Sequence, residues 1–531
     1  MIESPSVHLM SSEKTLIDLA LSQPQSAIEV LAYEASNQDA ITADSGKTKR
    51  KLIPTNLPGP NQQFAFEVNV DRCSGCKGCV SACHHMNGLD TGESWRRVKE
   101  WFGNTEDSSW VHTVTSACHH CLDAECMLGC PVGAYEKNPI SGIVKHLDDQ
   151  CIGCEYCIWK CPYEVPEYHS SHGVVRKCDM CSDRLAMQIE PACVQACPHD
   201  AIRIETVDQP TIAEQTNYDS HLNQGMYPEA APSSITKPTT IYRSTKDLQS
   251  AQWSPLQGNQ TSQKAHWPLV IMLVMTQWGL GMIIGNMFWA ENSFRGGPSI
   301  SFLLGLGLVF SGLISSVLHL GQPTKAWRFF LGLRTSWLSR EILAFTLLSL
   351  LLLADGISQW LHLIPPNYQG IWQWIVTATI ASAVMSSVMI YHDTHRPSWR
   401  MPITSLRFFS TLAIGLILLL WEGFVRLELE QSRSILMALF LTLVSGWKLQ
   451  LGGIFKFCRW KVLVGFLWGL TISWIWLVTL SELVNVSGPH TWVWKLSVGL
   501  MLVSCEIIER RQFFISTRAP VGHGVGSWVA G

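Results

Sequence analysis

The sequence has few charged residues and almost no net charge. Lys, Arg, Asp and Glu make up 15% of its 531 residues and sum to −3 at pH 7. Because nucleic-acid binding needs an excess of positive charge, we expect no nucleic-acid partner. The N-terminus, MIESPSVHLMSSEKTL, lacks a basic stretch before an apolar core and lacks a twin-arginine pair. We therefore expect no export signal.

Cysteine is nearly absent outside one stretch. Only Cys458 and Cys505 lie outside residues 73–197, which hold the other sixteen of the eighteen cysteines. The sixteen form four groups, which are Cys73, Cys76, Cys79 and Cys83; Cys118, Cys121, Cys126 and Cys130; Cys151, Cys154, Cys157 and Cys161; and Cys178, Cys181, Cys193 and Cys197. The first and third groups have the spacing C-x2-C-x2-C-x3-C, and three groups end in Cys-Pro.

This spacing is the ligand pattern of ferredoxins with [4Fe–4S] clusters, which take four thiolates each. Sixteen cysteines therefore predict four clusters. Zinc ribbons use CxxC pairs at wider separation and have no use for the third cysteine or the Cys-Pro ending. Disulfide frameworks belong to small secreted domains with a signal peptide, and neither condition holds here. Thiolates that hold metal suit a reducing compartment, so we expect the cysteine-rich domain in the cytosol.

Short β-type runs flank the cysteine groups. They are FAFEVNVD before Cys73, GIVKHLD before Cys151 and AIRIETV after Cys197. A strand, a cysteine loop, a short helix and another strand make one ferredoxin-like unit, so the four groups predict two modules of two clusters each. In two-cluster ferredoxins the fourth cysteine of each run ligates the other cluster of its module.

The second half of the chain is dominated by long apolar runs. Eight are long enough to span ~30 Å of hydrocarbon, at about 267–289, 299–320, 342–363, 371–391, 405–424, 434–455, 461–483 and 491–513. The fifth and eighth are the least regular, because Glu422 and Glu506 lie inside their ends.

The predicted fold is an α+β ferredoxin-like iron–sulfur domain of two two-cluster modules, followed by an all-α membrane domain of eight transmembrane helices. The predicted divisions are an N-terminal extension (1–62), the four-cluster domain (63–210), a linker (211–265), the membrane anchor (266–514) and a tail (515–531). The extension contains one possible amphipathic helix, roughly from Glu13 to Tyr33.

Loop charge predicts the orientation in the membrane. Loops on the side of the cysteine-rich domain carry Lys325, Arg328, Arg334, Arg340, Arg396, Arg400, Arg407, Lys456, Arg459 and Lys461, and the tail adds Arg510, Arg511 and Arg518. Loops on the other side carry only Arg295, Arg426 and Arg433. Because cytoplasmic loops are enriched in Lys and Arg, we expect the cluster domain and both termini to face the cytoplasm across the inner membrane.

Both halves resemble subunits of one enzyme family. Residues 64–205 resemble the four-cluster iron–sulfur subunit of dimethyl-sulfoxide-reductase-type molybdopterin enzymes, through CSGCKGCVSACH, CHHCLDAECMLGCPVGA, CIGCEYCIWKCPY and KCDMCSDRL…PACVQACP. Residues 266–524 resemble the eight-helix anchor subunit of the same enzymes, through HWPL, HLGQP, TSWLSREI, RPSW and CEIIERRQFF. The two subunits look fused into one chain.

The resemblance implies that each cluster takes ligands from two groups. The implied sets are set 1, Cys73, Cys76, Cys79 and Cys197; set 2, Cys178, Cys181, Cys193 and Cys83; set 3, Cys118, Cys121, Cys126 and Cys161; and set 4, Cys151, Cys154, Cys157 and Cys130. Some relatives replace one ligand with Trp, but here every position is Cys.

The resemblance also implies a membrane quinol site, with His319 of HLG and Glu341 of SREI as the residues that handle its protons. Quinol oxidation releases two protons with two electrons, so a His and a carboxylate at the membrane surface suit the reaction. Arg340 and Trp337 are candidates to hold the quinone headgroup. For His319, a histidine that merely satisfies a helix end is an equally simple interpretation.

A haem in the anchor would need two histidines that face each other from different helices. His319, His392 and His395 belong near one membrane surface, and His362 and His490 near the other. All lie at the ends of predicted helices, so we predict an anchor without haem.

The predicted function is electron transfer. Electrons pass from membrane quinol through the clusters to a separate molybdopterin-containing catalytic subunit, because this chain has no molybdopterin or substrate-binding motif of its own. The expected cytoplasmic orientation favours a cytosolic partner, such as a nitrate or other oxyanion reductase, over an exported one. Two alternatives remain: reverse flow from a molybdenum or tungsten dehydrogenase to quinone, and a non-enzymatic anchor or assembly platform.

Overall fold

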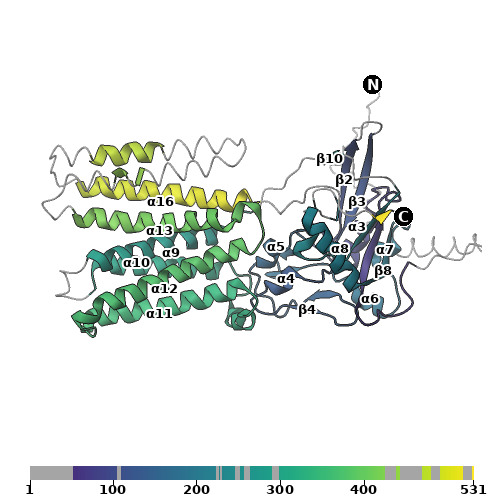
Figure 1. Cartoon of the computed structure of the whole chain (residues 1–531), viewed down its shortest axis with the longest axis horizontal. Coiled ribbons are helices and arrows are strands. Elements are labelled where there is room, and N and C mark those ends of the chain that lie inside the picture. Colours follow the sequence, from purple (N-terminus) through teal and green to yellow (C-terminus); the bar gives the residue numbers. More distant parts are fainter. Residues whose placement is uncertain are drawn as a thin grey trace, which may run out of the picture.

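The computed structural model shows an α+β domain at one end of a bundle of long helices (Figure 1). This confirms the predicted order of an α+β domain followed by an all-α domain. The described residues are 52–104, 109–222, 226–227, 230–245, 252–255, 264–289, 298–424, 438–439, 441–442, 469–479, 491–517 and 529–530. The helix expected between Glu13 and Tyr33 lies outside them.

The cysteine stretch folds into short elements. Its helices are α3 (Gly78–Met86), α4 (Glu125–Leu128), α5 (Tyr156–Lys160), α6 (Ser182–Ala186) and α7 (Ala192–Gln195). Its strands are β1 (Gln62–Asn69), β2 (Arg97–Asn104), β3 (Ser109–Ser116), β4 (Tyr135–Lys137), β5 (Val144–His146), β6 (Glu167–His169), β7 (Val174–Arg176) and β8 (Ile202–Asp208). Strands β4–β5 and β6–β7 form two separate hairpins.

The segment that follows β8 lies on this domain. It contains α8 (Gln209–Leu222), the 3₁₀ turn η1 (Ser233–Ile235), β9 (Ile241–Ser244) and β10 (Gln252–Pro255). Strand β9 pairs with β1 in parallel, β10 pairs with β2, and the C-terminal β11 (Val529–Ala530) pairs with β9. The C-terminal end of the chain therefore returns to the α+β domain.

Strand β1 is an interior strand of its sheet, and a buried carboxylate helps fix its neighbours. Glu67 is 2% exposed and forms ion pairs with Arg203 of β8 and, at 2.6 Å, with Arg243 of β9. Because one carboxylate binds guanidinium groups from both sides, a slip of either neighbouring strand would break one of the two ion pairs of this buried charge.

Two of the cysteine loops share an unusual backbone conformation. Lys77 follows the second cysteine of the first group, and Glu155 follows the second cysteine of the third group. Both have left-handed φ angles, 61° and 58°, and each stands immediately before a short helix. Residues other than glycine rarely adopt this backbone conformation. Its occurrence at the same position in both groups shows that the repeated spacing folds into the same local structure.

Five helices in the described part of the chain are long and apolar enough to cross a membrane. They are α9 (Trp267–Trp289), α10 (Ile300–Leu318), α11 (Trp337–Leu361), α12 (Pro366–His392) and α13 (Met401–Phe424). They correspond to the first five predicted segments. Of the sixth and seventh, only 438–439, 441–442 and a shorter apolar helix, Gly469–Thr479, are described. Helix α16 (Thr491–Ile515) covers the eighth.

Helix α9 is the centre of the bundle, and glycines allow its neighbours to approach it closely. A Cβ atom on Gly281 would lie 2.1 Å from the carbonyl oxygen of Leu412 in α13. One on Gly279 would lie 2.5 Å from the carbonyl oxygen of Gly305 in α10. Small residues at such crossings are the usual basis of helix packing in membranes, where no hydrophobic difference drives association.

The cysteine loops rest directly on the ends of these helices that lie nearest the α+β domain. The 3₁₀ segment η3 (Pro323–Gly332) joins α10 to α11, and the shorter η4 (Pro397–Trp399) joins α12 to α13. The amide of Gln322 donates to the carbonyl of Ile152 at 3.0 Å, and the amide of Gly332 donates to that of Pro131 at 2.9 Å. Lys160 Nζ donates to Asp393 Oδ2 at 2.8 Å. We call this contact region the seam.

Gly321 lies at the tightest point of the seam. A Cβ atom there would lie 2.0 Å from the carbonyl oxygen of Gly173, so backbone would have to move. We expect Gly321→Ala to lower the free energy of unfolding of the detergent-solubilised chain by roughly 1–3 kcal/mol, measured by urea denaturation. Gly307→Ala is the control, because no atom lies within 4 Å of that Cβ position. Equal stability of the two variants would contradict a close-packed seam.

Candidate functional site

The sixteen cysteines gather into four compact sets, each made from two groups. Cavities identify two sets: one is lined by Cys73, Cys76, Cys79 and Cys197, and another by Cys118, Cys121, Cys126 and Cys161. The other two sets are identified by cysteines that lie close enough to affect one another's charge. Cys83 lies close to Cys181 and Cys193, and Cys178 lies close to Cys83 and Cys193. Cys157 lies close to Cys130, Cys151 and Cys154. These are the sets 1 to 4 that the resemblance implies.

Contacts between the sets place them in a series that ends at the helical bundle. Cys79 of set 1 is an electrostatic neighbour of Cys193 of set 2, and Cys178 of set 2 is a neighbour of Cys118 of set 3. Tyr135 stands between sets 3 and 4, since its hydroxyl is near both Cys126 and Cys157. Set 4 is the one at the seam. The order from the anchor outward is therefore 4, 3, 2, 1.

The donor chemistry of these sets fits iron–sulfur clusters. Burial raises the pKa of the Cys83 thiol to about 12, and that of Cys161 to about 11, with neighbouring cysteines adding to the effect. Four thiolates so close together cannot all be ionised unless a cation lies among them, and cluster iron supplies that charge. Backbone amides also point at sulfur, with Ala134 N donating to Cys130 Sγ at 3.2 Å and Ala201 N to Cys197 Sγ at 3.3 Å. Such hydrogen bonds are usual around cluster thiolates.

His319 caps the end of α10 against the loop of set 4. Its Nε2 atom is buried and has no hydrogen-bond partner, and its ring lies near the backbone of Cys154. Burial lowers its pKa to about 4, so the imidazole is neutral near pH 7. A neutral imidazole nitrogen without a partner can accept a hydrogen bond and then a proton.

His266 and Glu155 complete the surroundings of His319. The rings of His266 and His319 meet edge to face with centroids 5.3 Å apart, and ligand atoms of all three residues lie within 4.8 Å of one another. Burial lowers the pKa of His266 to about 4. The sequence assigned no role to either residue, although His266 lies in the HWPL motif and Glu155 directly follows a predicted ligand.

Glu341 lies close to the same loop, at Tyr156. It is 6% exposed near the start of α11, and the hydroxyl of Ser387 in α12 donates to it. Its carboxylate is an electrostatic neighbour of the hydroxyl groups of Tyr156 and Tyr391. Within the described residues no hydrogen bond or ion pair joins Glu341 to His319. The structure therefore brings both residues to the loop of set 4.

Arg340 and Trp337 contact each other, and Trp337 also packs against the apolar cluster that contains Tyr156 and Trp159. The guanidinium of Arg340 stacks on the Trp337 ring, 4.4 Å from its centroid, and donates to the carbonyls of Leu333 and Arg334. These bonds hold the turn between η3 and α11.

Trp159 of α5 is inserted into an aromatic cluster of the anchor. Its ring packs against His266, Tyr391, Trp399 and Phe514, with centroid distances of 4.9 to 6.2 Å. Trp159 stands two residues after Cys157, so this contact fixes the position of set 4 over the membrane helices. It also excludes water from the space between the loop and the anchor.

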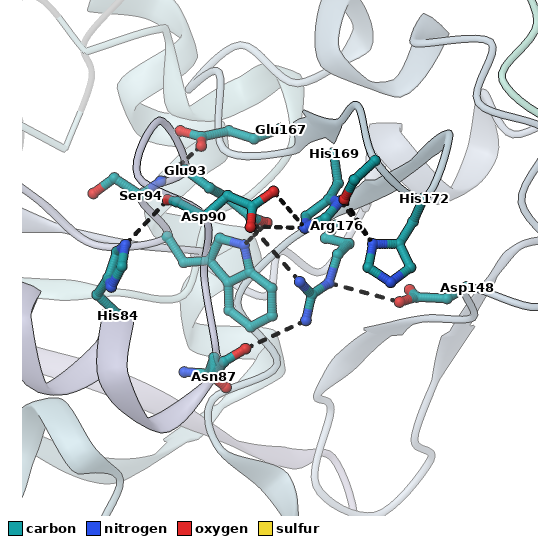
Figure 2. Close-up of polar contacts among 12 residues, drawn as sticks. His84, Asn87, Asp90, Glu93, Ser94, Asp148, Glu167, His169, His172 and Arg176 are labelled. Atoms are coloured by element: carbon teal, nitrogen blue, oxygen red, sulfur yellow. Dashed lines mark hydrogen bonds and ion pairs between the residues drawn. The ribbon is translucent and has the colours of Figure 1, made fainter. Parts of the chain in front are cut away.

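A polar network joins the segment that follows α3 to the β6–β7 hairpin (Figure 2). Arg176 of β7 stacks on Trp95 at 5.2 Å and forms an ion pair with Glu93 at 3.6 Å. His169 of β6 pairs with Asp90 at 3.0 Å. Because the turn of this hairpin contains Gly173, the network braces the point where the cluster domain touches Gly321 of the anchor.

A cavity of about 270 Å³ lies at the far end of the membrane helices. It is lined by residues that include Asp355, His362 and Gln373. Asp355 accepts hydrogen bonds from Trp372 at 2.6 Å and Gln359 at 2.9 Å, which accounts for its burial. This cavity is remote from all four cysteine sets.

Comparison with known proteins finds similarity in both halves of the chain. The 4Fe-4S dicluster domain family matches residues 110–207, and the family of the DMSO reductase anchor subunit (DmsC) matches residues 261–486. One of the chains of the anaerobic dimethyl sulfoxide reductase of Haemophilus influenzae is 33% identical over 194 residues, which cover 35% of this chain and 91% of that protein.

Two further relatives differ in the reactions that their names state. The thiosulfate reductase electron transfer subunit PhsB of Salmonella typhi is 38% identical over 155 residues, covering 28% of this chain and 79% of that protein. A sulfite dehydrogenase subunit of Allochromatium vinosum is 34% identical over 170 residues, covering 28% of this chain and 70% of that protein.

Serine substitutions at the fourth cysteine of a group test the crossed sets. Replacing one thiolate by a hydroxyl alters the cluster it ligates and leaves the other clusters unchanged. We expect Cys197→Ser to change the same electron paramagnetic resonance (EPR) signal as Cys73→Ser, and Cys83→Ser to change the same signal as Cys178→Ser. The measurement is low-temperature EPR of dithionite-reduced membranes. If Cys83→Ser and Cys73→Ser affected one common signal, the sets derived from the geometry would be wrong.

Proposed function

Because this protein belongs to the dimethyl sulfoxide reductase family of iron–sulfur subunits and continues into that family's membrane anchor, we propose that it carries electrons from membrane quinol to a separate molybdopterin subunit. It is a multi-pass membrane protein and an iron–sulfur electron-transfer subunit. The observation that carries the proposal is the series of four cysteine sets, which ends on the anchor beside His319 and Glu341.

Four [4Fe–4S] clusters are the proposed cofactors, held by sets 1 to 4. When bound, they supply sites that take up and release one electron at a time. The cysteines hold the iron, the backbone amides donate to sulfur, and Trp159 with its aromatic neighbours keeps water out of the seam. The repeated left-handed turns at Lys77 and Glu155 support a description as two modules of two clusters.

The proposed divisions are those given by the sequence, with the cluster domain at 63–210 and the anchor at 266–514. We assign eight membrane helices to the anchor, since five spans are described and apolar sequence continues to residue 513. The segment 211–265 then acts as a strap, which is consistent with the pairing of β9 and β10 to the cluster domain.

His319 and Glu341 are the proposed proton acceptors for quinol. One quinol hydroxyl would donate to the free Nε2 of His319, in the place where the protein itself provides no partner. Glu341, buried beneath Tyr156, would receive the second proton. Both groups lie next to the loop of set 4, so proton loss and electron loss would occur at one place.

We assign the cluster domain and both termini to the cytoplasmic side, on the basis of the basic residues in the loops beside it. Protons from quinol would then be released on the side where a cytosolic reductase consumes protons. Turnover would move little or no net charge across the membrane. The terminal reduction belongs to the partner subunit and not to this chain.

Substitutions at the two acceptors test the quinol site. We expect His319→Gln and Glu341→Gln each to slow quinol-driven reduction of the clusters on the order of 100-fold, because each removes a proton acceptor. Reduction by dithionite should be unchanged. Matched controls at the other membrane surface are His362→Gln and Asp355→Asn, which should keep the normal rate. Normal quinol-driven rates in both acceptor variants would favour a structural anchor instead.

The reverse direction is the second candidate, and one relative favours it, since it is named a sulfite dehydrogenase subunit. In that case electrons would pass from a dehydrogenase through the same residues to quinone. Midpoint potentials separate the two directions. We expect an EPR-monitored redox titration to place the clusters near or above the potential of the quinone pool, because quinol must reduce them. A series of clusters poised far below the pool would support the dehydrogenase direction.

A further inference from the structure

Two cations lie in the interior of the cluster domain, each at the boundary between two cysteine sets. Arg96 is 1% exposed and Lys177 is 3% exposed. In the part of the chain that the structure describes, neither forms an ion pair with a carboxylate. Isolated buried charges are strongly unfavourable, so something else in the folded protein must balance them.

Arg96 lies between sets 1 and 2. Its Nη1 donates to Thr115 Oγ1 at 3.2 Å, and its guanidinium stacks 4.6 Å from the centroid of the Phe66 ring. Its Nε and Nη2 atoms are buried with no hydrogen-bond partner. Its electrostatic neighbours are cysteines of both sets, namely Cys79 of set 1 and Cys83, Cys178 and Cys193 of set 2.

Lys177 lies between sets 2 and 3. It directly precedes Cys178 of set 2, and its Nζ atom donates to the Cys178 carbonyl at 3.0 Å and to that of Val144. The same Nζ lies 3.6 Å from Cys118 Sγ of set 3, and Cys126 of set 3 is also an electrostatic neighbour. Each cation thus faces sulfur on two sides.

The negative charge of bound clusters would balance these two buried cations. A [4Fe–4S] cluster with four thiolate ligands carries net negative charge, and it becomes more negative by one when it takes up an electron. A nearby fixed cation in a medium of low dielectric stabilises the reduced form more than the oxidised form. Net charge around a cluster is one of the properties that set its reduction potential.

We propose that Arg96 and Lys177 set the reduction potentials of the middle of the electron path, with Arg96 acting on sets 1 and 2 and Lys177 on sets 2 and 3. They are tuning residues that act through the clusters and touch no substrate. This inference rests on the proposed cluster ligands. Both cations would affect the reduction potential of the set 2 cluster. Neither would affect that of set 4, where electrons enter from the anchor.

The test removes each charge by substituting the unbranched, apolar side chain of Met. Lys177→Met and Arg96→Met would be compared with the charge-retaining Lys177→Arg and Arg96→Lys in the full-length chain, in membranes. A surface control is Lys145→Met, because Lys145 is 41% exposed and its ion pair with Asp183 is 3.1 Å long. Each variant would be reduced stepwise with dithionite and followed by EPR. The serine substitutions described above assign the signals of sets 1 and 2, and Cys118→Ser and Cys151→Ser assign those of sets 3 and 4 in the same way.

We expect Lys177→Met to lower the midpoint potentials of the set 2 and set 3 clusters, and Arg96→Met those of sets 1 and 2. Each shift should reach a tenfold change in the reduction equilibrium, which is 59 mV for a one-electron couple. Set 4 should not move in either variant, and Lys145→Met should move none. The charge-retaining variants should return the potentials toward the original values.

Iron content and spin quantitation distinguish failure of this inference from failure of the proposed function. Four intact clusters with unshifted potentials in both Met variants would overturn the tuning role and leave electron transfer untouched. A shift of equal size at set 4 would also overturn it. Loss of clusters in both Met variants would assign Arg96 and Lys177 a purely structural role. Absence of four clusters from the unsubstituted chain would instead refute the proposed function.

Discussion

Charge balance around buried sulfur is the constraint on which the rest of the cluster domain depends. Sixteen thiols in four sets cannot all ionise inside one small domain unless iron lies among them. The same requirement explains backbone amides that point at sulfur and two cations that, among the described residues, have no carboxylate partner. Short helices and loops suit this task better than long elements, because they bring cysteines from distant groups around one centre.

The seam attaches the cluster domain to the membrane helices. Gly173 and Gly321 let two loops touch backbone to backbone, and Trp159 extends from the cluster domain into aromatic residues of the anchor. These contacts place set 4 within reach of His319 and Glu341 while excluding water. Fusion of the two subunits into a single polypeptide keeps this contact intramolecular, and the strands β9 to β11 tie later parts of the sequence to the cluster domain.

Much of the site followed from residue spacing, and the rest did not because it depends on distant contacts. The cysteine groups and the first five membrane segments were predictable from the sequence. His266 and Glu155 were not assigned roles, because only folding brings them to within 4.8 Å of His319. In the sequence, Arg96 is an ordinary charged residue before a strand, and Lys177 is an ordinary charged residue before a cysteine. Their burial between cysteine sets is a tertiary property.

The sequence by itself determined the cofactor type and the membrane character. Cysteine spacing decides which metal centre the thiolates can hold, and the length of an apolar run decides whether it can cross a bilayer, so both follow from local sequence. The combination of cysteines from two groups in each set could be predicted only from the resemblance. No local feature of the sequence indicates that Cys83 lies close to Cys181 and Cys193. Tertiary structure decided their order toward the membrane and the separation of His319 from Glu341. It also decided which cations lie in the interior, because each of these depends on where folding places residues far apart in the chain.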